Sequence, residues 1–226
     1  MKELIKKFRL KLFAEKKYSH RFRLNAKAQS MVEVAVTLPI LLSLFLGLVE
    51  FGFMLNTYLS LLDATRYAAR QYSNSNPLTA AGDSNPLFFS GVADAVVLSL
   101  EPADTAARQI PLDPTMDDIL VSAISVEVDE TADPDVIQTI TRHSSPGIFY
   151  SKYGNGFTTK YEDAEIEAYM TANGAVPVDS GILIVEINYS YEGVLGISTM
   201  FINMFAPDNH IMIYASTIMP LVSVRP

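Results

Sequence analysis

The chain contains no cysteine, and only three of its 226 residues are histidine. The lack of cysteine excludes disulfide bonds, a cysteine nucleophile, a zinc ribbon and a lipoprotein attachment site. The sequence also lacks an HExxH pair, a phosphate-binding glycine loop and a dinucleotide-binding fingerprint. His20 precedes the apolar segment, so only His143 and His210 belong to the C-terminal region. We therefore expect no catalytic residue, cofactor, metal or small-molecule substrate.

Two short patterns suggest chemistry but are better explained as structure. The run from His143 to Ser145 resembles part of a hydrolase site, yet neither a nucleophile elbow nor a glycine-rich oxyanion loop accompanies it. An ordinary surface histidine with its hydrogen bonds satisfied is the favoured interpretation. The acidic stretch Asp129 to Asp135 is an alternative site for Ca²⁺, but its spacing is not that of an EF-hand loop. We favour a solvated hairpin tip.

Charge is scarce and unevenly distributed. Charged residues make up 19% of the chain, against about a quarter in an average soluble protein. Residues 1–28 contain ten Lys/Arg and two Glu, a net charge of +8, whereas the rest has seven basic and 23 acidic residues, a net charge of −16. A basic head can bind nucleic acid, but the apolar run that follows favours an orientation signal that stays in the cytoplasm. We expect no nucleic-acid partner.

The apolar excess is concentrated in one segment. Val34–Val49 contains no charged residue, and apolar residues resume after Glu50 and continue to Asp63. A membrane span needs about 20 apolar residues, which residues 34–55 supply if Glu50 is tolerated near the far end. A cleaved secretory signal is the alternative. It fits poorly, because the basic region is long, Glu33 directly precedes the apolar run and no small-x-small site follows it closely.

Glu33 allows two interpretations from the residues alone. In the first, Glu33 and Glu50 lie at opposite membrane interfaces, since their separation by 17 positions corresponds to about 25 Å of helix. In the second, cleavage after Ala28 makes Gln29 the new N-terminus. The freed α-amino group of a neighbouring subunit then pairs with Glu33 inside the membrane.

Several elements from residue 28 onward occur in a characteristic order. They are a small residue followed five positions later by Glu and an apolar residue, a proline within the apolar run, a Gly-x-x-Glu-Phe-Gly element and an Ala/Arg-rich helix. In this sequence they are Ala28, Glu33-Val34, Pro39, Gly47–Gly52 and Ala64–Arg70. This pattern resembles the N-terminal region of TadE-like proteins, minor pseudopilins of the tight-adherence (Flp-type) pilus system. The chain departs from it in having Ala28 in place of the usual Gly.

The resemblance implies a structural protein of pilus assembly and favours the second interpretation of Glu33. It implies cleavage between Ala28 and Gln29 by a prepilin peptidase and docking to other pilins or pseudopilins through Glu33, Pro39 and Glu50. It also implies a single-pass protein of a bacterial inner membrane, with its N-terminus in the cytoplasm and its C-terminal domain outside. The alternatives are an uncleaved single-pass protein whose outer domain binds a ligand or adheres to a surface and, more remotely, an anchored hydrolase.

The patterns predict three regions and an α+β fold. Residues 1–28 are a basic leader, residues 29–72 one helix that spans the membrane and then packs on a folded domain, and residues 73–226 the exported domain. In this domain we expect a loop over 74–92, a helix that starts at a Thr159–Glu162 capping box and ends at Asn173-Gly174, and an apolar packing element over 194–205. The strands are expected at Val96–Glu101, Ile119–Asp129, Val136–Arg142, Ile182–Tyr191 and Ile211–Pro220, the second and third forming a hairpin. A long helix followed by mostly antiparallel strands is the order of a pilin-like subunit.

Overall fold

The computed structural model describes residues 26–102, 109–129, 136–144, 147–171, 180–195 and 210–221. The chain divides into two compact units, Met1–Leu46 and Gly47–Pro226. Four expectations lie mainly or wholly outside the described residues: the basic leader, the acidic turn before Asp135, the helix end at Asn173-Gly174 and the apolar element after Leu195.

One long helix, α2, covers Ala26–Tyr72. It ends at the predicted residue, and the N–H of Ser75 then bonds the carbonyl of Tyr72 at 2.9 Å. Within Ser30–Tyr72 its most apolar stretch has a mean hydropathy of 2.3 and is fully exposed, so the helix is long and apolar enough to cross a membrane. Pro39 lies inside it, as expected.

The predicted loop over 74–92 is confirmed only as far as Asn85, because helix α3 occupies Pro86–Leu100. For the same reason the predicted strand over Val96–Glu101 is wrong. Its start has a clear physical cause: the Asn85 side chain accepts the N–H of Leu87 at 3.1 Å, and Pro86 needs no hydrogen-bond acceptor in the first turn. Asn-Pro was interpreted as a turn although it also begins helices. Buried apolar residues recur through α3 at helical spacing, namely Phe88, Phe89, Val92, Ala93, Ala95, Val96 and Leu100.

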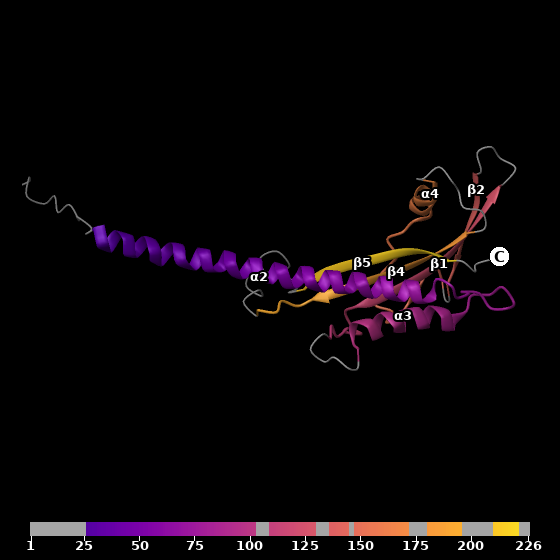
Figure 1. The fold of residues 1–226 in the computed structure, drawn as a ribbon, viewed down its shortest axis with the longest axis horizontal. Coiled ribbons are helices and arrows are strands. Elements are labelled where there is room, and N and C mark those ends of the chain that lie inside the picture. Colours follow the sequence, from indigo (N-terminus) through magenta and orange to yellow (C-terminus); the bar gives the residue numbers. More distant parts are fainter. Residues whose placement is uncertain are drawn as a thin grey trace, which may run out of the picture. The chain divides into compact units, whose positions relative to one another are not determined.

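The strands form one antiparallel sheet (Figure 1), and four of the predicted strands are confirmed. They are β1 (Asp118–Asp129), β2 (Val136–His143), β4 (Ser180–Tyr191) and β5 (Ile211–Leu221). Their order is β2-β1-β4-β5, and the two-residue strand β3 (Tyr150–Ser151) pairs with β1. The predicted hairpin of β1 and β2 is present, with Val126 opposite Ile140.

Helix α4 covers Asp163–Thr171 and begins later than the capping box predicts. Its first turn carries Asp163 and Glu165, which the helix dipole favours, as expected. Thr159 does not cap it, however. The Thr159 hydroxyl instead donates to the buried Glu186 of β4 at 2.5 Å, and the last residue before the helix is Glu162.

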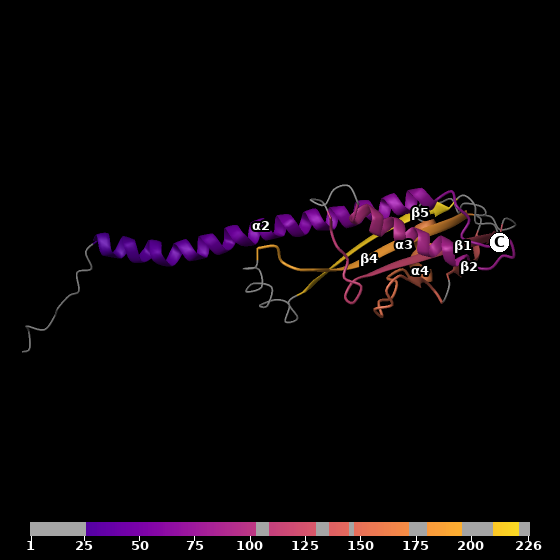
Figure 2. The same cartoon turned by 90° about the horizontal axis from the view of Figure 1, so that it is seen from below.

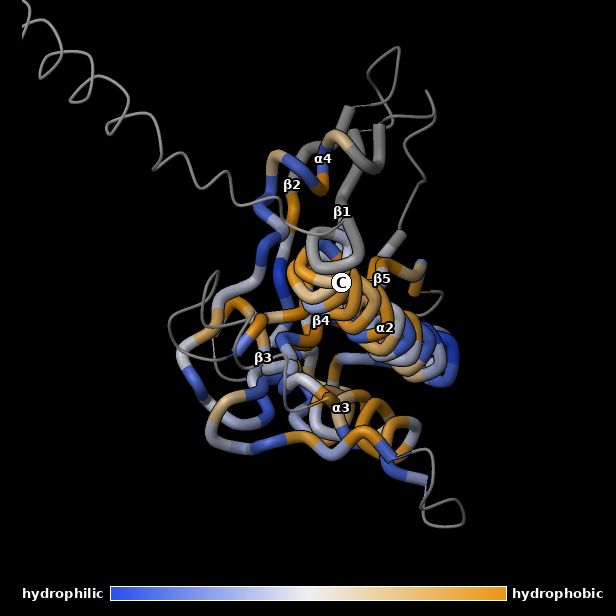
Figure 3. The backbone as a smooth tube through the Cα atoms, turned by 90° about the vertical axis from the view of Figure 1, so that its left-hand side faces the viewer, coloured by the Kyte–Doolittle hydropathy of each residue, from blue (hydrophilic) through white to orange (hydrophobic). Residues whose placement is uncertain are grey.

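The two faces of the sheet have different covers (Figures 2 and 3). The larger core lies on the face that α3 and the C-terminal part of α2 cover, where Leu183, Val185 and Ile187 of β4 point. In Figure 3, α3 is coloured as largely hydrophobic. The other face carries a smaller cluster in which Ile166 of α4 packs on Ile184. As predicted, the C-terminal part of α2 packs on the folded domain, and Leu61, Ala68 and Ala69 are buried in the larger core.

Candidate functional site

The most specific polar contact of α2 joins Glu50 to the end of β4. Oε1 of Glu50 accepts the hydroxyl of Tyr191 at 2.7 Å and the N–H of Val194 at 2.9 Å. Oε2 accepts the N–H of Leu195 at 3.1 Å. The carboxylate therefore holds one side chain and two successive backbone amides of the turn that follows β4. Hydrogen bonds to a charged acceptor are stronger than those between neutral groups.

The environment of Tyr191 keeps its hydroxyl protonated in this contact. The side chain of Tyr191 is buried, and burial is the main cause of a pKa well above the ordinary tyrosine value. The hydrogen bond to Glu50 raises this pKa further, because an ionised phenol has no proton to donate to a carboxylate. The hydroxyl therefore remains a donor throughout the physiological pH range.

A second contact fixes α2 on the sheet further along the helix. The hydroxyls of Thr65 in α2 and Thr217 in β5 lie 2.8 Å apart, and Thr65 is fully buried. Ala64, Ala68 and Ala69 flank it, and their small side chains allow the helix to approach the strands closely. Together, the two contacts define which part of α2 belongs to the folded domain.

The predicted site residues lie along α2 and are not brought together. Ala28 and Gln29 lie in its first turn, and Glu33 and Pro39 follow in the first compact unit, whereas Glu50 belongs to the second. The side chain of Glu33 is exposed. Sequence reasoning missed the partners of Glu50. The available signal was physical: a carboxylate placed after sixteen uncharged residues requires hydrogen-bond donors.

Residues 28–70 match the model of the family described as TadE-like protein. This segment of the chain is similar to TadE-like proteins. Neither the curated proteins nor the solved structures gave a significant match to the chain. The resemblance inferred from Ala28, Glu33, Pro39 and the Gly-x-x-Glu-Phe-Gly element is thus confirmed. The long apolar helix followed by an antiparallel sheet is a pilin-like α+β arrangement.

Beyond the TadE-like segment, two buried carboxylates fasten loops to the sheet. Asp118 of β1 accepts the hydroxyl of Ser151 at 2.6 Å, the N–H of Tyr153 at 3.0 Å and the N–H of Asn155 at 3.3 Å. Glu186 of β4 accepts the hydroxyl of Tyr214 at 2.7 Å, in addition to the hydroxyl of Thr159. Since all these partners are donors of the chain itself, the carboxylates of Asp118 and Glu186 have a structural role: they hold neighbouring segments against the sheet.

Among the described residues after α2, no side chains are arranged for catalysis. Nε2 of His143 lies 2.7 Å from the Ser125 hydroxyl, but Ser125 is buried in the sheet and, among the described residues, none orients the second ring nitrogen. Burial lowers the pKa of His143 below its ordinary value. The histidine thus has its hydrogen bond, as predicted, although it is half-buried. The same residues contain no group of three or more side chains suited to bind a metal.

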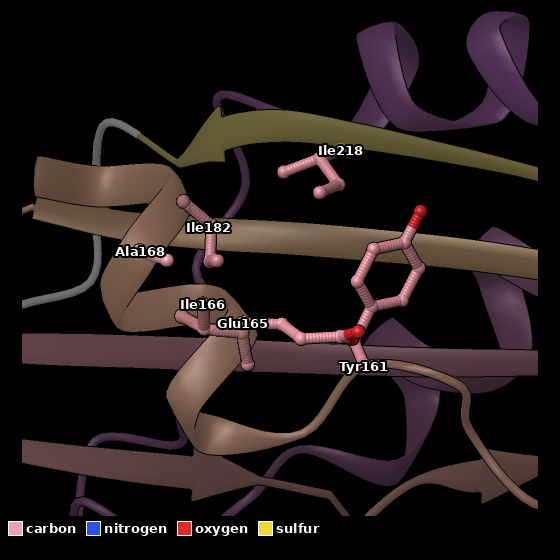
Figure 4. A pocket seen from close by; sticks show the side chains of 6 residues that line it. All are labelled: Tyr161, Glu165, Ile166, Ala168, Ile182 and Ile218. Carbon is pink, nitrogen blue, oxygen red and sulfur yellow. The ribbon is translucent and has the colours of Figure 1, made fainter. Parts of the chain in front are cut away.

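An open apolar cavity of about 310 Å³ lies between α4 and the sheet. Figure 4 shows Ile166 and Ala168 of α4 on one side and Ile182 of β4 and Ile218 of β5 on the other. Glu165 and Tyr161 complete the lining, and the Tyr161 hydroxyl is within 2.7 Å of the Ser216 hydroxyl. The cavity thus has an acidic rim and an apolar floor.

Proposed function

We propose that the protein is a minor pseudopilin that takes part in assembly of a tight-adherence pilus. The TadE-like match over residues 28–70 carries this proposal, because it coincides with the exposed apolar part of α2. The same helix continues into the α+β domain through the contacts of Glu50 and Thr65. A subunit of this design combines a membrane anchor and an exported domain in one continuous helix.

Processing after Ala28 by a prepilin peptidase is part of the proposal. It would expose the α-amino group of Gln29, and Glu33 would become the fifth residue of the mature chain. A carboxylate at the edge of the membrane core is costly unless it is paired or reaches water, and the new amino group of a neighbouring subunit would supply the partner. The pair would set the stagger between helices. Pro39 would contribute by removing one backbone hydrogen bond and bending the helix.

Of the two carboxylates, we assign docking to Glu33. Glu50 accepts three hydrogen bonds from its own chain, so its role within the subunit is already defined. The basic leader would stay in the cytoplasm and the acidic domain would lie outside the inner membrane, in accordance with the positive-inside rule.

The decisive experiment is an intact-mass measurement of the protein from membranes of its native host, with and without the prepilin peptidase. We expect a chain that begins at Gln29 only when the peptidase is present. Ala28→Phe should prevent processing, whereas Ala28→Gly, which keeps a small residue, should allow it. Processed Glu33→Ala protein should accumulate without pilus assembly, and Glu33→Asp, which keeps the charge, should retain part of it.

A second candidate is an uncleaved single-pass protein whose outer domain binds a ligand. The open cavity lined by Ile166, Ile182 and Ile218 is the observation that favours it. A full-length mass in the presence and absence of the peptidase would support this candidate and remove the amino group that docking through Glu33 requires.

A further inference from the structure

We propose that the outer membrane interface extends past Glu50, so that the turn after β4 lies in it and Val194 inserts at the boundary between headgroups and acyl chains. The partner is therefore the lipid bilayer, contacted by the folded domain itself. The inference shares with the proposed function the premise that α2 crosses the membrane. It depends neither on processing after Ala28 nor on pilus assembly.

The first step is a count along α2. A hydrocarbon core of about 30 Å requires about 20 residues of helix, and the apolar run begins at Val34. Twenty residues from Val34 end at Phe53, which is three residues beyond Glu50. A span that starts at Val34 thus places the Glu50 carboxylate in the last helical turn of the core. Any tilt of the helix places it deeper.

The second step is how Glu50 tolerates this position. An ionised carboxylate at membrane depth must find donors in the protein where water is scarce. Glu50 finds three, the hydroxyl of Tyr191 and the amides of Val194 and Leu195, all within 3.1 Å. Because these donors touch the carboxylate, the turn that carries them lies at the same depth as Glu50.

The third step is the surface around this contact. Val194 is 60% exposed although it is apolar. On α2, apolar exposure continues beyond Glu50 through Phe51, Phe53, Leu55, Tyr58 and Leu59. A tyrosine such as Tyr58 is suited to the membrane boundary, because its ring is apolar and its hydroxyl can reach polar headgroups. The exposed apolar surface is therefore continuous in sequence with the span.

Charge limits the depth of the turn. Glu192, two residues before Val194, is exposed. An exposed carboxylate is costly in the hydrocarbon core but tolerated among headgroups. The turn is therefore placed at the interface, with Val194 directed to the acyl chains and Glu192 to water.

The test uses the absence of tryptophan from the chain, which makes one introduced tryptophan the only such fluorophore. Val194→Trp places it in the turn. Ile148→Trp is the matched control, because Ile148 is 59% exposed and lies just before β3. Tyr150 of β3 pairs with Val121 of β1, which in turn pairs with Val185 of β4. Val185 is six residues from Tyr191, about 20 Å of strand, so the control position is far from the turn. The two full-length chains are placed singly in lipid nanodiscs made with lipids brominated near the headgroup end of their acyl chains.

We expect the Val194→Trp chain to show blue-shifted emission that brominated lipids quench about twofold, as insertion by 5–10 Å would give. The Ile148→Trp chain should emit as in water, without quenching. Water-like, unquenched emission from position 194 would overturn the proposal. Blue-shifted but unquenched emission would also overturn it, because protein and not lipid would then cover the turn. If blue-shifted, unquenched emission arises only when several chains share a membrane, the cover is a second copy. Failure here leaves processing after Ala28 untouched, since intact mass reports on that step separately.

Discussion

The hydroxyl of Tyr191 lies 2.7 Å from Oε1 of Glu50, a contact that joins residues 141 positions apart in the sequence. It connects the last residue of β4 to the point on α2 where the uncharged run ends. The contact therefore fixes where along the helix the folded domain begins. A shift of α2 by one turn would move Glu50 by about 5 Å and break it.

The first prediction concerns this pair. Glu50→Ala should destabilise the domain more than Tyr191→Phe, because Glu50 also accepts the amides of Val194 and Leu195. We expect a coupling energy of about 1.5–3 kcal/mol in the double-mutant cycle, as for a hydrogen bond to a charged group. The measurement is urea unfolding of the full chain in detergent micelles.

The matched control for this cycle is Tyr67→Phe. Tyr67 lies on the same helix as Glu50 but is 51% exposed, and its substitution should change the free energy of unfolding by less than about 0.5 kcal/mol. Additive effects of Glu50→Ala and Tyr191→Phe would contradict a specific bond between the two side chains.

Much of the fold is predictable from the sequence because its periodicity is strong. In Ile182–Tyr191 every second residue from Leu183 is apolar or aromatic, and Leu183, Val185 and Ile187 indeed lie on the face that α2 and α3 cover. The end of α2 was also predictable, since Pro77 disfavours helix in the residue before it. Local rules were sufficient in both cases because tertiary packing reinforced them.

Other features depended on contacts that no local pattern reveals. Thr159 has the spacing of a helix cap, but Glu186, 27 residues later in the chain, competes for its hydroxyl. The start of α3 uses Asn85 as a cap, a role that the Asn-Pro pair fills as readily as a turn. The donors of Glu50 lie at the end of β4 and in the turn after it, more than 140 residues later in the chain. A buried carboxylate reveals its need for partners in the sequence, but not their positions.

The second prediction concerns the hydrogen bonds that Asp118 accepts from residues 151–155. Asp118→Asn replaces one acceptor oxygen with an amide, so the N–H of Asn155 and the hydroxyl of Ser151 no longer share a carboxylate oxygen. We expect a loss of about 1–3 kcal/mol in the free energy of unfolding, the usual cost of an unsatisfied buried group. Amide hydrogen exchange should accelerate in residues 151–155 first.

Asp83→Asn is the control for this substitution, because Asp83 is exposed. It should alter neither the unfolding midpoint nor the exchange of residues 151–155. An equal acceleration of exchange throughout the sheet in the Asp118→Asn chain would contradict a local role of Asp118 in holding residues 151–155.

The third prediction is a pH dependence that originates at His143. Burial lowers the pKa of this histidine in the folded chain below its ordinary value of about 6.5, so the unfolded chain binds more protons between the two pKa values. Stability should therefore rise with pH through this window and level off above about pH 6.5. It should fall as the pH decreases through the same window.

His143→Gln tests the origin of this slope, because glutamine does not titrate and can still bond the Ser125 hydroxyl. Urea midpoints of both chains at pH 7.5 and 5.5 provide the measurement. The decrease on acidification should be smaller in the variant, since His210 and the carboxylates contribute equally to both chains. An identical decrease would show that His143 is not its source.

The fourth prediction uses the close approach of α2 and α3 at Gly91. A Cβ atom added there would lie 2.5 Å from the hydroxyl oxygen of Tyr72, a ring that also packs edge-on against Phe88 with centroids 5.7 Å apart. Alanine favours a helix interior over glycine by about 0.5–1 kcal/mol, so Gly91→Ala alone would be expected to stabilise α3. The clash opposes this gain, and displacing a packed ring costs about 1–3 kcal/mol. We therefore expect Gly91→Ala to lower the urea midpoint of the full chain.

The clash is mainly with the hydroxyl, so in a Tyr72→Phe background the same substitution should cost less or become stabilising. A Gly91→Ala effect of the same size in both backgrounds would show that the Tyr72 hydroxyl does not limit the distance between the two helices.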